Sequence, residues 1–201
     1  MIRAPFAESA FHGVDALAKG GITGIEITFS TPDAPDIIDL LRQRFGDSVL
    51  IGAGSIVQPS QAIEAAQAGA SFLVSPGRLR VRCEGHHRNG PHTMLRALTL
   101  SKVTAANDAG ADVIKIFPAS LNGPKVIVSL KGPFPGLAFM PTGGVSVANL
   151  DQWLATGVAA VGAGGELRSS SDLAEGRYDD IREHAFAFSS RYHAIREGVN
   201  R

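Results

Sequence analysis

The chain has 201 residues, enough for one domain with a substantial hydrophobic core. Its 19 Lys and Arg residues balance its 19 Asp and Glu residues, so the composition indicates neither a nucleic acid nor a membrane surface as partner. A single cysteine, Cys83, excludes an intrachain disulfide, and no apolar run or charged-then-apolar leader resembles a membrane or export segment, so we expect a cytoplasmic protein.

Short apolar runs alternate with helical patterns along most of the chain. In chain order, the pattern predicts helix Ala7–Lys19, strand Gly24–Phe29, helix Ala34–Phe45, strand Val49–Ile51, helix Pro59–Ala68, strand Phe72–Val74, helix Leu100–Ala109, strand Val113–Phe117, strand Ala138–Met140, helix Val147–Thr156, strand Ala159–Val161 and helix Asp179–Arg196. Near-continuous apolar strands that alternate with helices indicate a parallel sheet covered on both faces.

Two architectures fit this pattern, an open doubly wound sheet and a (β/α)8 barrel. No G-x-G-x-x-G follows the first strand, which argues against a dinucleotide-binding sheet. Six visible units, with room for one more at each gap, favour a compact (β/α)8 TIM barrel formed by one domain, residues 1–201. Its first strand would be only Met1–Arg3, so we expect it to be truncated.

Lys115 is one of five lysines and lies inside the apolar run 113–117. By strand alternation it shares a face with Val113 and Phe117, which would direct the ammonium group into the barrel. Desolvation favours the neutral form of an amine, and the neutral amine is the form that attacks a carbonyl. The alternative is a structural lysine that reaches the strand end or pairs with a carboxylate.

Glu26 and Thr28 share one face of the strand at 24–29. A glutamate in a buried strand needs a partner, and Lys115 across the same barrel would be suitable. The two could form only a structural ion pair. A carboxylate beside an amine can also move protons during imine formation.

Two glycine-rich turns follow the last two predicted strands. The first reads P-T-G-G at Pro141–Gly144, and the second reads V-G-A-G-G at Val161–Gly165. Such turns before a helix expose backbone N–H groups to an anion. Paired turns at these positions form the usual phosphate site of a barrel, although simple tight turning is the alternative.

Six ordered segments of this chain resemble the 2-keto-3-deoxy-6-phosphogluconate (KDPG) and 4-hydroxy-2-oxoglutarate (KHG) aldolase family. They are GGITGIEITFSTP (20–32), IGAGSI (51–56), FLVSPG (72–77), GADVIKIFPAS (110–120), KGPFP (131–135) and MPTGGV (140–145). The resemblance implies a (β/α)8 barrel, a homotrimer and class I aldolase chemistry without metal or cofactor. It also implies a lyase of Entner–Doudoroff carbohydrate metabolism, acting on a small 2-keto acid and a sugar phosphate.

The same resemblance implies roles for individual residues. Lys115 matches the Schiff-base lysine of the family's K-x-F-P motif, and Glu26 matches the proton-shuttling glutamate of its E-[VI]-T motif. Ser55 stands where the family usually has threonine, and a serine common in the second phosphate loop is absent. The implied substrate-binding residues are Arg3, Thr28, Ser55, Pro76, Phe117 and Thr142, and the implied phosphate-binding residues are Gly143, Gly144, Gly162 and Gly164.

The chain departs from the family at an arginine. Many relatives carry one four residues after the glutamate, where this chain has Ser30. Other members have an arginine at the end of the first strand, and Arg3 matches that one. Arg3 is therefore a candidate for binding the substrate's carboxylate or phosphate. The alternative is a solvated terminal arginine.

A larger departure lies between Gly77 and Ala97, where the family has a helix and then a strand ending in a Pro-Gly turn. Here the nineteen residues 78–96 contain five arginines and three histidines, with no helical or strand periodicity. Our hypothesis is a local reading-frame slip, which resequencing to a single open frame would contradict. A metal site formed by Cys83, His86, His87 and His92 is spaced unlike a zinc cluster, so we expect none.

Two other classes of function remain open. A degenerate paralogue would bind sugar phosphates without turnover, and the altered segment 78–96 and the short first strand are the reasons to consider it. A barrel isomerase or epimerase would use the same phosphate site without a buried lysine. Among aldolases, the 6-phosphogalactonate epimer is the alternative substrate.

Overall fold

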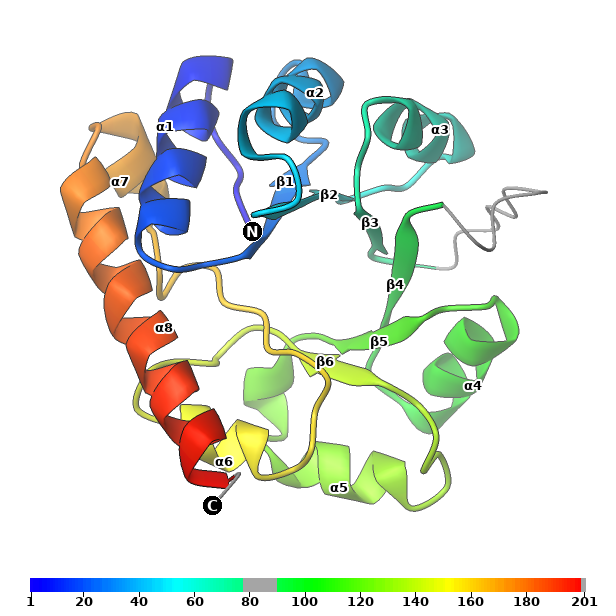
Figure 1. Cartoon of the computed structure of the whole chain (residues 1–201). Helices are drawn as coiled ribbons and strands as arrows, with labels where there is room; N and C mark the ends of the chain where they lie inside the picture. Colours follow the sequence, from blue (N-terminus) through cyan, green and yellow to red (C-terminus); the bar gives the residue numbers. More distant parts are fainter. Residues whose placement is uncertain (78–89, 200–201) are drawn as a thin grey trace.

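The fold is an α/β fold built on one parallel sheet, which the computed structural model describes for residues 1–77 and 90–199 (Figure 1). The strands are β1 (Gly24–Thr28), β2 (Leu50–Gly54), β3 (Phe72–Ser75), β4 (His92–Ala97), β5 (Val113–Ile116) and β6 (Phe139–Pro141). They are hydrogen-bonded in sequence order, each to the next. Consecutive parallel strands require crossover connections, and described helices lie in the connections from β1 to β2, β2 to β3, β4 to β5 and β5 to β6.

The helices lie on the outside of a curled sheet (Figure 1). They are α1 (Ala7–Lys19), α2 (Ala34–Phe45), α3 (Pro59–Gln67), α4 (Leu100–Asp108), α5 (Lys125–Lys131), α6 (Leu150–Leu154), α7 (Ser170–Ala174) and α8 (Tyr178–Val199), with the 3₁₀ helix η1 at Ala119–Leu121. Isolated parallel bridges, Ile2 to Ile27 and Thr142 to Gly162, add a position beyond each edge strand. Among the described residues the sheet therefore has six strands and two bridges.

Alternation along the strands separates a packed face from a functional face. In β1, Ile25 and Ile27 are at most 1% exposed, and in β5 the same holds for Ile114 and Ile116. These side chains belong to the hydrophobic core, to which the helices contribute apolar residues such as Leu17 and Ile38. The alternate residues of the same strands therefore point to the concave side of the sheet.

Helix α8, in the C-terminal part of the chain, lies along α1, in the N-terminal part (Figure 1). A Cβ atom built on Gly20, at the end of α1, would overlap the Cβ of Ala185 in α8. Ala185 is fully buried there. Glycine at position 20 thus permits the close approach that closes the helical layer around the sheet.

The structure corrects several expectations. The segment 78–96 does contain a strand, because β4 pairs in register with β3 (Phe72 with His92) and with β5 (Met94 with Val113). The sequence pattern of this strand is poor, but backbone pairing on both sides stabilises it. Its residue Leu95 is buried in the hydrophobic core. The expected strand at 159–161 is reduced to the single bridge at Gly162, and the helix expected at 147–156 is only α6.

Three of the four residues considered as metal ligands, Cys83, His86 and His87, lie outside the described residues. His92, the fourth, is exposed in β4, where its Nδ1 lies 3.9 Å from Asp112 Oδ2. Within residues 1–77 and 90–199, no group of three His, Cys, Asp or Glu side chains is arranged to hold a metal ion. In the same ranges, no helix combines the length and apolar character needed to cross a membrane.

Candidate active site

The concave face of the sheet holds a buried ion pair between Lys115 and Glu26. The Nζ atom of Lys115 lies 3.0 Å from Oε2 of Glu26, and the two side chains are 9% and 10% exposed. Lys115 belongs to β5 and Glu26 to β1, so three strands separate them in the sheet. Contact across three strands requires strong curvature, and it confirms the pairing expected from the sequence.

Each partner of this pair retains hydrogen-bonding capacity. In the part of the chain that the structure describes, Nζ of Lys115 donates one hydrogen bond, to Glu26, although an ammonium has three donors. Glu26 likewise accepts only this bond from a side chain there. A buried ion pair stabilises a fold only when its remaining groups are satisfied, so this pair is arranged to meet a ligand more than to hold the sheet.

Thr142 follows β6, the strand next to the one that carries Lys115, and its hydroxyl group has no partner among the described residues. Its residue is 7% exposed, and its Oγ1 has no hydrogen-bond partner among the described residues. The residue follows β6, whose Met140 pairs in register with Lys115. An unpaired buried hydroxyl is costly, which favours a role in binding over a structural role.

The two glycine turns are neighbours, as predicted. The bridge between Thr142 and Gly162 joins them, and Gly162 N donates to Pro141 O at 2.8 Å. Gly143 and Gly144 have φ values of 83° and 87°, and neither of their amides donates a hydrogen bond within the described residues. Because α6 begins only at Leu150, turn amides rather than a helix start would contact an anion here.

The other expected substrate-binding residues divide into two groups. Ser55, with a φ of 59°, Pro76 and Phe117 follow the carboxyl ends of β2, β3 and β5, where a barrel-type site is expected. Thr28 is buried, but its Oγ1 lies 2.9 Å from Ser30 Oγ, so it orders the turn after β1. Arg3 is exposed, and its side chain makes no hydrogen bond or ion pair among residues 1–77 and 90–199.

Sequence reasoning missed two features of this face. Gly54 in β2 leaves the space that the Glu26 side chain fills, since a Cβ there would overlap Oε1. Arg96 in β4 pairs in register with Lys115. Gly54 could have been found from the G-A-G segment. Arg96 could not, because its segment gave no strand pattern.

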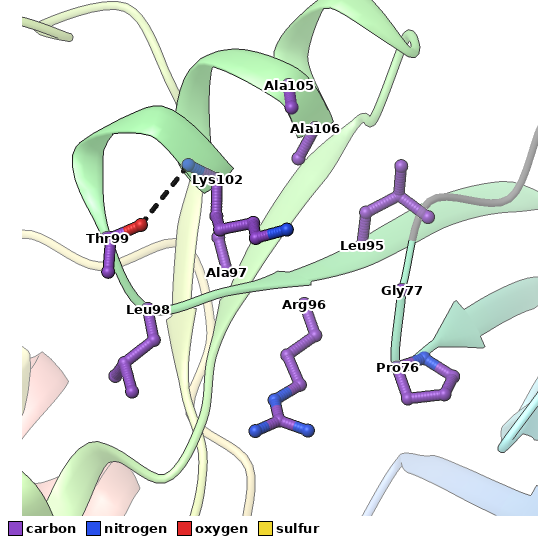
Figure 2. Close-up of a pocket in the computed structure, with 10 residues that line it drawn as sticks. All are labelled: Pro76, Gly77, Leu95, Arg96, Ala97, Leu98, Thr99, Lys102, Ala105 and Ala106. Atoms are coloured by element: carbon purple, nitrogen blue, oxygen red, sulfur yellow. Dashed lines mark hydrogen bonds between the residues drawn. The ribbon is translucent and has the colours of Figure 1, made fainter.

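Arg96 also borders a cavity of about 420 Å³ at the end of β4. Figure 2 shows this cavity with Pro76 and Gly77 on one side and Thr99 and Lys102 at the start of α4 on the other. Neither Lys115 nor Glu26 lines it. The cavity thus lies beside the site of the buried pair, on the α4 side of β4.

The arrangement can perform a particular chemistry. A buried amine within 3.0 Å of a carboxylate is a nucleophile with an adjacent proton acceptor. Unbonded turn amides beside it offer a site for an anionic group. The fold and site together define an α/β enzyme equipped to form an imine with an anionic carbonyl compound.

Comparison with known proteins agrees with this class. The chain belongs to the KDPG and KHG aldolase family, whose pattern matches residues 1–184. It is 34% identical over 178 residues to a 2-dehydro-3-deoxy-phosphogluconate aldolase of Treponema pallidum, covering 87% of this chain and 83% of that protein. It is 31% identical to the 2-dehydro-3-deoxy-6-phosphogalactonate aldolase of Escherichia coli, covering 87% and 86%.

A solved structure gives the corresponding likeness in three dimensions. The KDPG aldolase of Legionella pneumophila, with pyruvate captured as a covalent carbinolamine intermediate, superposes with a TM-score of 0.82. It shares 31% sequence identity and covers 94% of this chain and 92% of its own. The chain is accordingly a class I aldolase, and class I aldolases are lyases.

Proposed function

We propose that this aldolase cleaves 2-keto-3-deoxy-6-phosphogluconate into pyruvate and glyceraldehyde 3-phosphate, with Lys115 as the Schiff-base lysine. The observation that carries this assignment is the buried Lys115–Glu26 pair, with its 3.0 Å separation and its unused hydrogen-bonding capacity. A covalent pyruvate carbinolamine in the Legionella pneumophila relative supports the same reaction type.

The chemistry follows from the two side chains. Glu26 accepts a proton from the Lys115 ammonium, and the neutral amine then attacks C2 of the keto acid. The carbonyl electron pair moves to oxygen, which takes the proton from Glu26, and the nitrogen returns a proton to Glu26 to give a neutral carbinolamine. Glu26 then donates this proton to the hydroxyl, which leaves as water, so a protonated imine remains.

The imine drives carbon–carbon cleavage. The C3–C4 bond breaks, its electron pair enters the imine as an enamine, and the C4 hydroxyl loses its proton to give the aldehyde. Protonation of the enamine at C3 and hydrolysis of the resulting imine release pyruvate and restore Lys115. Glu26 is the nearest acid–base group to Nζ among the described residues.

Other residues must bind the remaining parts of the substrate, and their positions in the fold indicate which part each would bind. Gly143 and Gly144 on the first turn, with Gly162 and Gly164 on the second, would bind the phosphate through backbone amides. Thr142 would donate its unpartnered hydroxyl to a substrate oxygen. Ser55, Pro76 and Phe117 would line the opening at the strand ends, with Thr28 and Arg3 in support.

A second substrate deserves a direct test. The likeness to the phosphogalactonate aldolase of Escherichia coli, at 31% identity, favours the galactonate epimer as an alternative substrate. The family also includes KHG aldolases, so 4-hydroxy-2-oxoglutarate is a third. Comparison of kcat/KM for the three compounds will assign the preference.

We also propose that the chain forms one (β/α)8 domain over residues 1–201 and assembles as a cytoplasmic homotrimer. The bridges at Ile2 and Gly162 support the barrel, because they add positions at both edges of the six-stranded sheet. Family membership supports the trimer. Light scattering on the purified protein tests the assembly, and a monomer would contradict it.

Trapping the imine tests the function. We expect pyruvate and borohydride to add one reduced pyruvyl group to Lys115, located by peptide mass spectrometry. Lys115→Met should abolish both the adduct and cleavage activity. Lys125→Met removes an exposed lysine from the first position of α5 and should change neither.

Three results would change the assignment. Sugar-phosphate binding without an adduct would identify a non-catalytic binding protein. Isomerisation without an adduct would identify an isomerase or epimerase. An adduct on another lysine, retained in Lys115→Met, would show that the nucleophile is misassigned.

A further inference from the structure

Arg96 places a second cation beside Lys115 on the concave face of the sheet. The two residues are register partners on β4 and β5, and adjacent strands lie about 4.8 Å apart, so both side chains leave the same face. Figure 2 shows the orientation of Arg96, which points away from α4 while Leu95 points toward Ala105 and Ala106 of that helix.

The guanidinium of Arg96 is held over the carboxyl end of β5. Its Nε donates to the carbonyl oxygen of Phe117 at 3.1 Å, and its Cζ lies 5.1 Å from the centroid of the Phe117 ring. These contacts use one of five N–H donors and fix the plane of the group. The two terminal nitrogens donate no hydrogen bond among the described residues and can therefore bind a ligand.

Among the described residues, no acidic side chain neutralises this cation. Within residues 1–77 and 90–199, no carboxylate lies within 4.0 Å of Arg96, whereas Lys115 is paired with Glu26. A guanidinium bound to the Phe117 carbonyl and without a described counterion, at the strand ends of a site for anionic substrates, is suited to bind a carboxylate with two hydrogen bonds.

We infer that Arg96 binds the carboxylate of the 2-keto acid, a role that rests on the proposed function of Lys115. The imine forms at C2, and the carboxylate carbon is bonded directly to C2, so this anion is the one that must lie nearest Lys115. Arg96 occupies the register position next to Lys115.

The two sides of β5 separate the substrate's two anions. β4, with Arg96, pairs with one edge of β5, and β6, which leads to Thr142 and Gly143, pairs with the other. The Phe117 ring stands between them, with Arg96 against it and a Cβ position on Gly143 within 3.1 Å of its edge. The carboxylate therefore extends toward β4 and the phosphate toward β6.

Pyruvate trapping at increasing concentration tests this assignment, because pyruvate has a carboxylate and no phosphate. In Arg96→Met we expect the half-saturating pyruvate concentration for Lys115 adduct formation to rise about tenfold or more, with the maximal adduct unchanged. Pyruvamide has the same ketone but no charge, and its half-saturating concentration should not differ between Arg96→Met and the wild type.

Two further variants serve as controls. Arg96→Lys keeps the charge and should recover part of the loss. Lys102 borders the same cavity but belongs to the first turn of α4, on the other side of β4. Lys102→Met should therefore leave the half-saturating pyruvate concentration unchanged.

The outcomes separate the two proposals. If the wild type forms the adduct and Arg96→Met saturates at the same pyruvate concentration, Arg96 does not bind the carboxylate, whereas Lys115 keeps its role. If pyruvate saturation is unchanged but KM for the phosphorylated substrate rises, Arg96 binds the phosphate and the carboxylate assignment is wrong. If the wild type forms no adduct, both proposals fail.

Discussion

Gly54 and Glu26 fit together so closely that any side chain at position 54 would occupy the place of the carboxylate. A Cβ atom built on Gly54 would overlap Oε1 and approach Cγ of Glu26. Gly54→Ala should therefore displace the carboxylate from Lys115. Because a misplacement of about 1 Å can cost about 100-fold, we expect kcat/KM to fall by that order, as steady-state assays of aldol cleavage will measure.

Gly24→Ala is the matched control for this substitution. Gly24 begins β1, and a Cβ there would have no neighbour within 4 Å. Gly24→Ala should keep wild-type kcat/KM. Equal losses in the two variants would show that the Gly54→Ala effect comes from general damage to the sheet.

Glu26→Gln removes the proton acceptor and keeps the shape of the side chain. If Glu26 moves protons in carbinolamine and imine formation, kcat should fall about 100-fold or more, and trapping at saturating pyruvate should slow by a similar factor. Quenched-flow borohydride trapping measures that rate. A normal trapping rate in Glu26→Gln would indicate that the carboxylate is only the lysine's structural counterion.

Thr142→Val exchanges the hydroxyl for a methyl group at nearly constant volume. Because Oγ1 has no partner among the described residues, we expect the melting temperature to stay unchanged or rise. The substitution would then remove a hydrogen bond only from the substrate complex, so kcat/KM should fall about tenfold or more. Reduced stability with normal kinetics would contradict a substrate-binding role.

The ionisation of Asp172 makes the stability of the loop before α7 depend on pH. The Ser169 amide, which donates to Oδ2 at 2.6 Å, and the Arg177 guanidinium lower the pKa of Asp172 to about 2. A lowered pKa stabilises the fold above the unfolded-state value of about 3.9, and this stability is lost as the pH falls toward about 2.

Asp172→Asn should therefore be less stable than the wild type near neutral pH, by about 1 kcal/mol as for a lost helix cap. The difference in the free energy of unfolding between the variant and the wild type should narrow as the pH falls from about 4 to about 2. Urea unfolding at several pH values measures it. A gap that is independent of pH would assign the effect to hydrogen-bond geometry and not to charge.

The sequence predicted those parts of the fold and site that depend on local patterns. Strand alternation placed Glu26 and Lys115 on inward faces, and their contact at 3.0 Å bears this out. Glycine turns after neighbouring strands predicted that Thr142 and Gly162 would meet. Both predictions need only the strand period and the fact that parallel strands end at one edge.

The remainder depends on tertiary pairing that no single segment encodes. β4 has a mixed pattern, H-T-M-L-R-A, yet it forms a strand because β3 and β5 offer backbone partners on both sides. The segment expected as a strand at 159–161 forms only a single bridge, at Gly162. Its other backbone bond to β6 is from Ala159 N to Phe139 O, so its pairing is too sparse for a strand. Arg96 was missed with β4, because a side chain cannot be assigned to a site before its strand exists.

The separation of Lys115 from Glu26 has a consequence for how the enzyme comes into being. One partner comes from the first strand and the other from the fifth, 89 residues later, so neither half of the chain contains the reactive pair. In a partly folded chain each group would be an ordinary hydrated ion. Reactivity toward pyruvate should thus appear only when the curved sheet has brought β1 and β5 together. During refolding, the rate at which this reactivity appears would report that late step and not the formation of the helices.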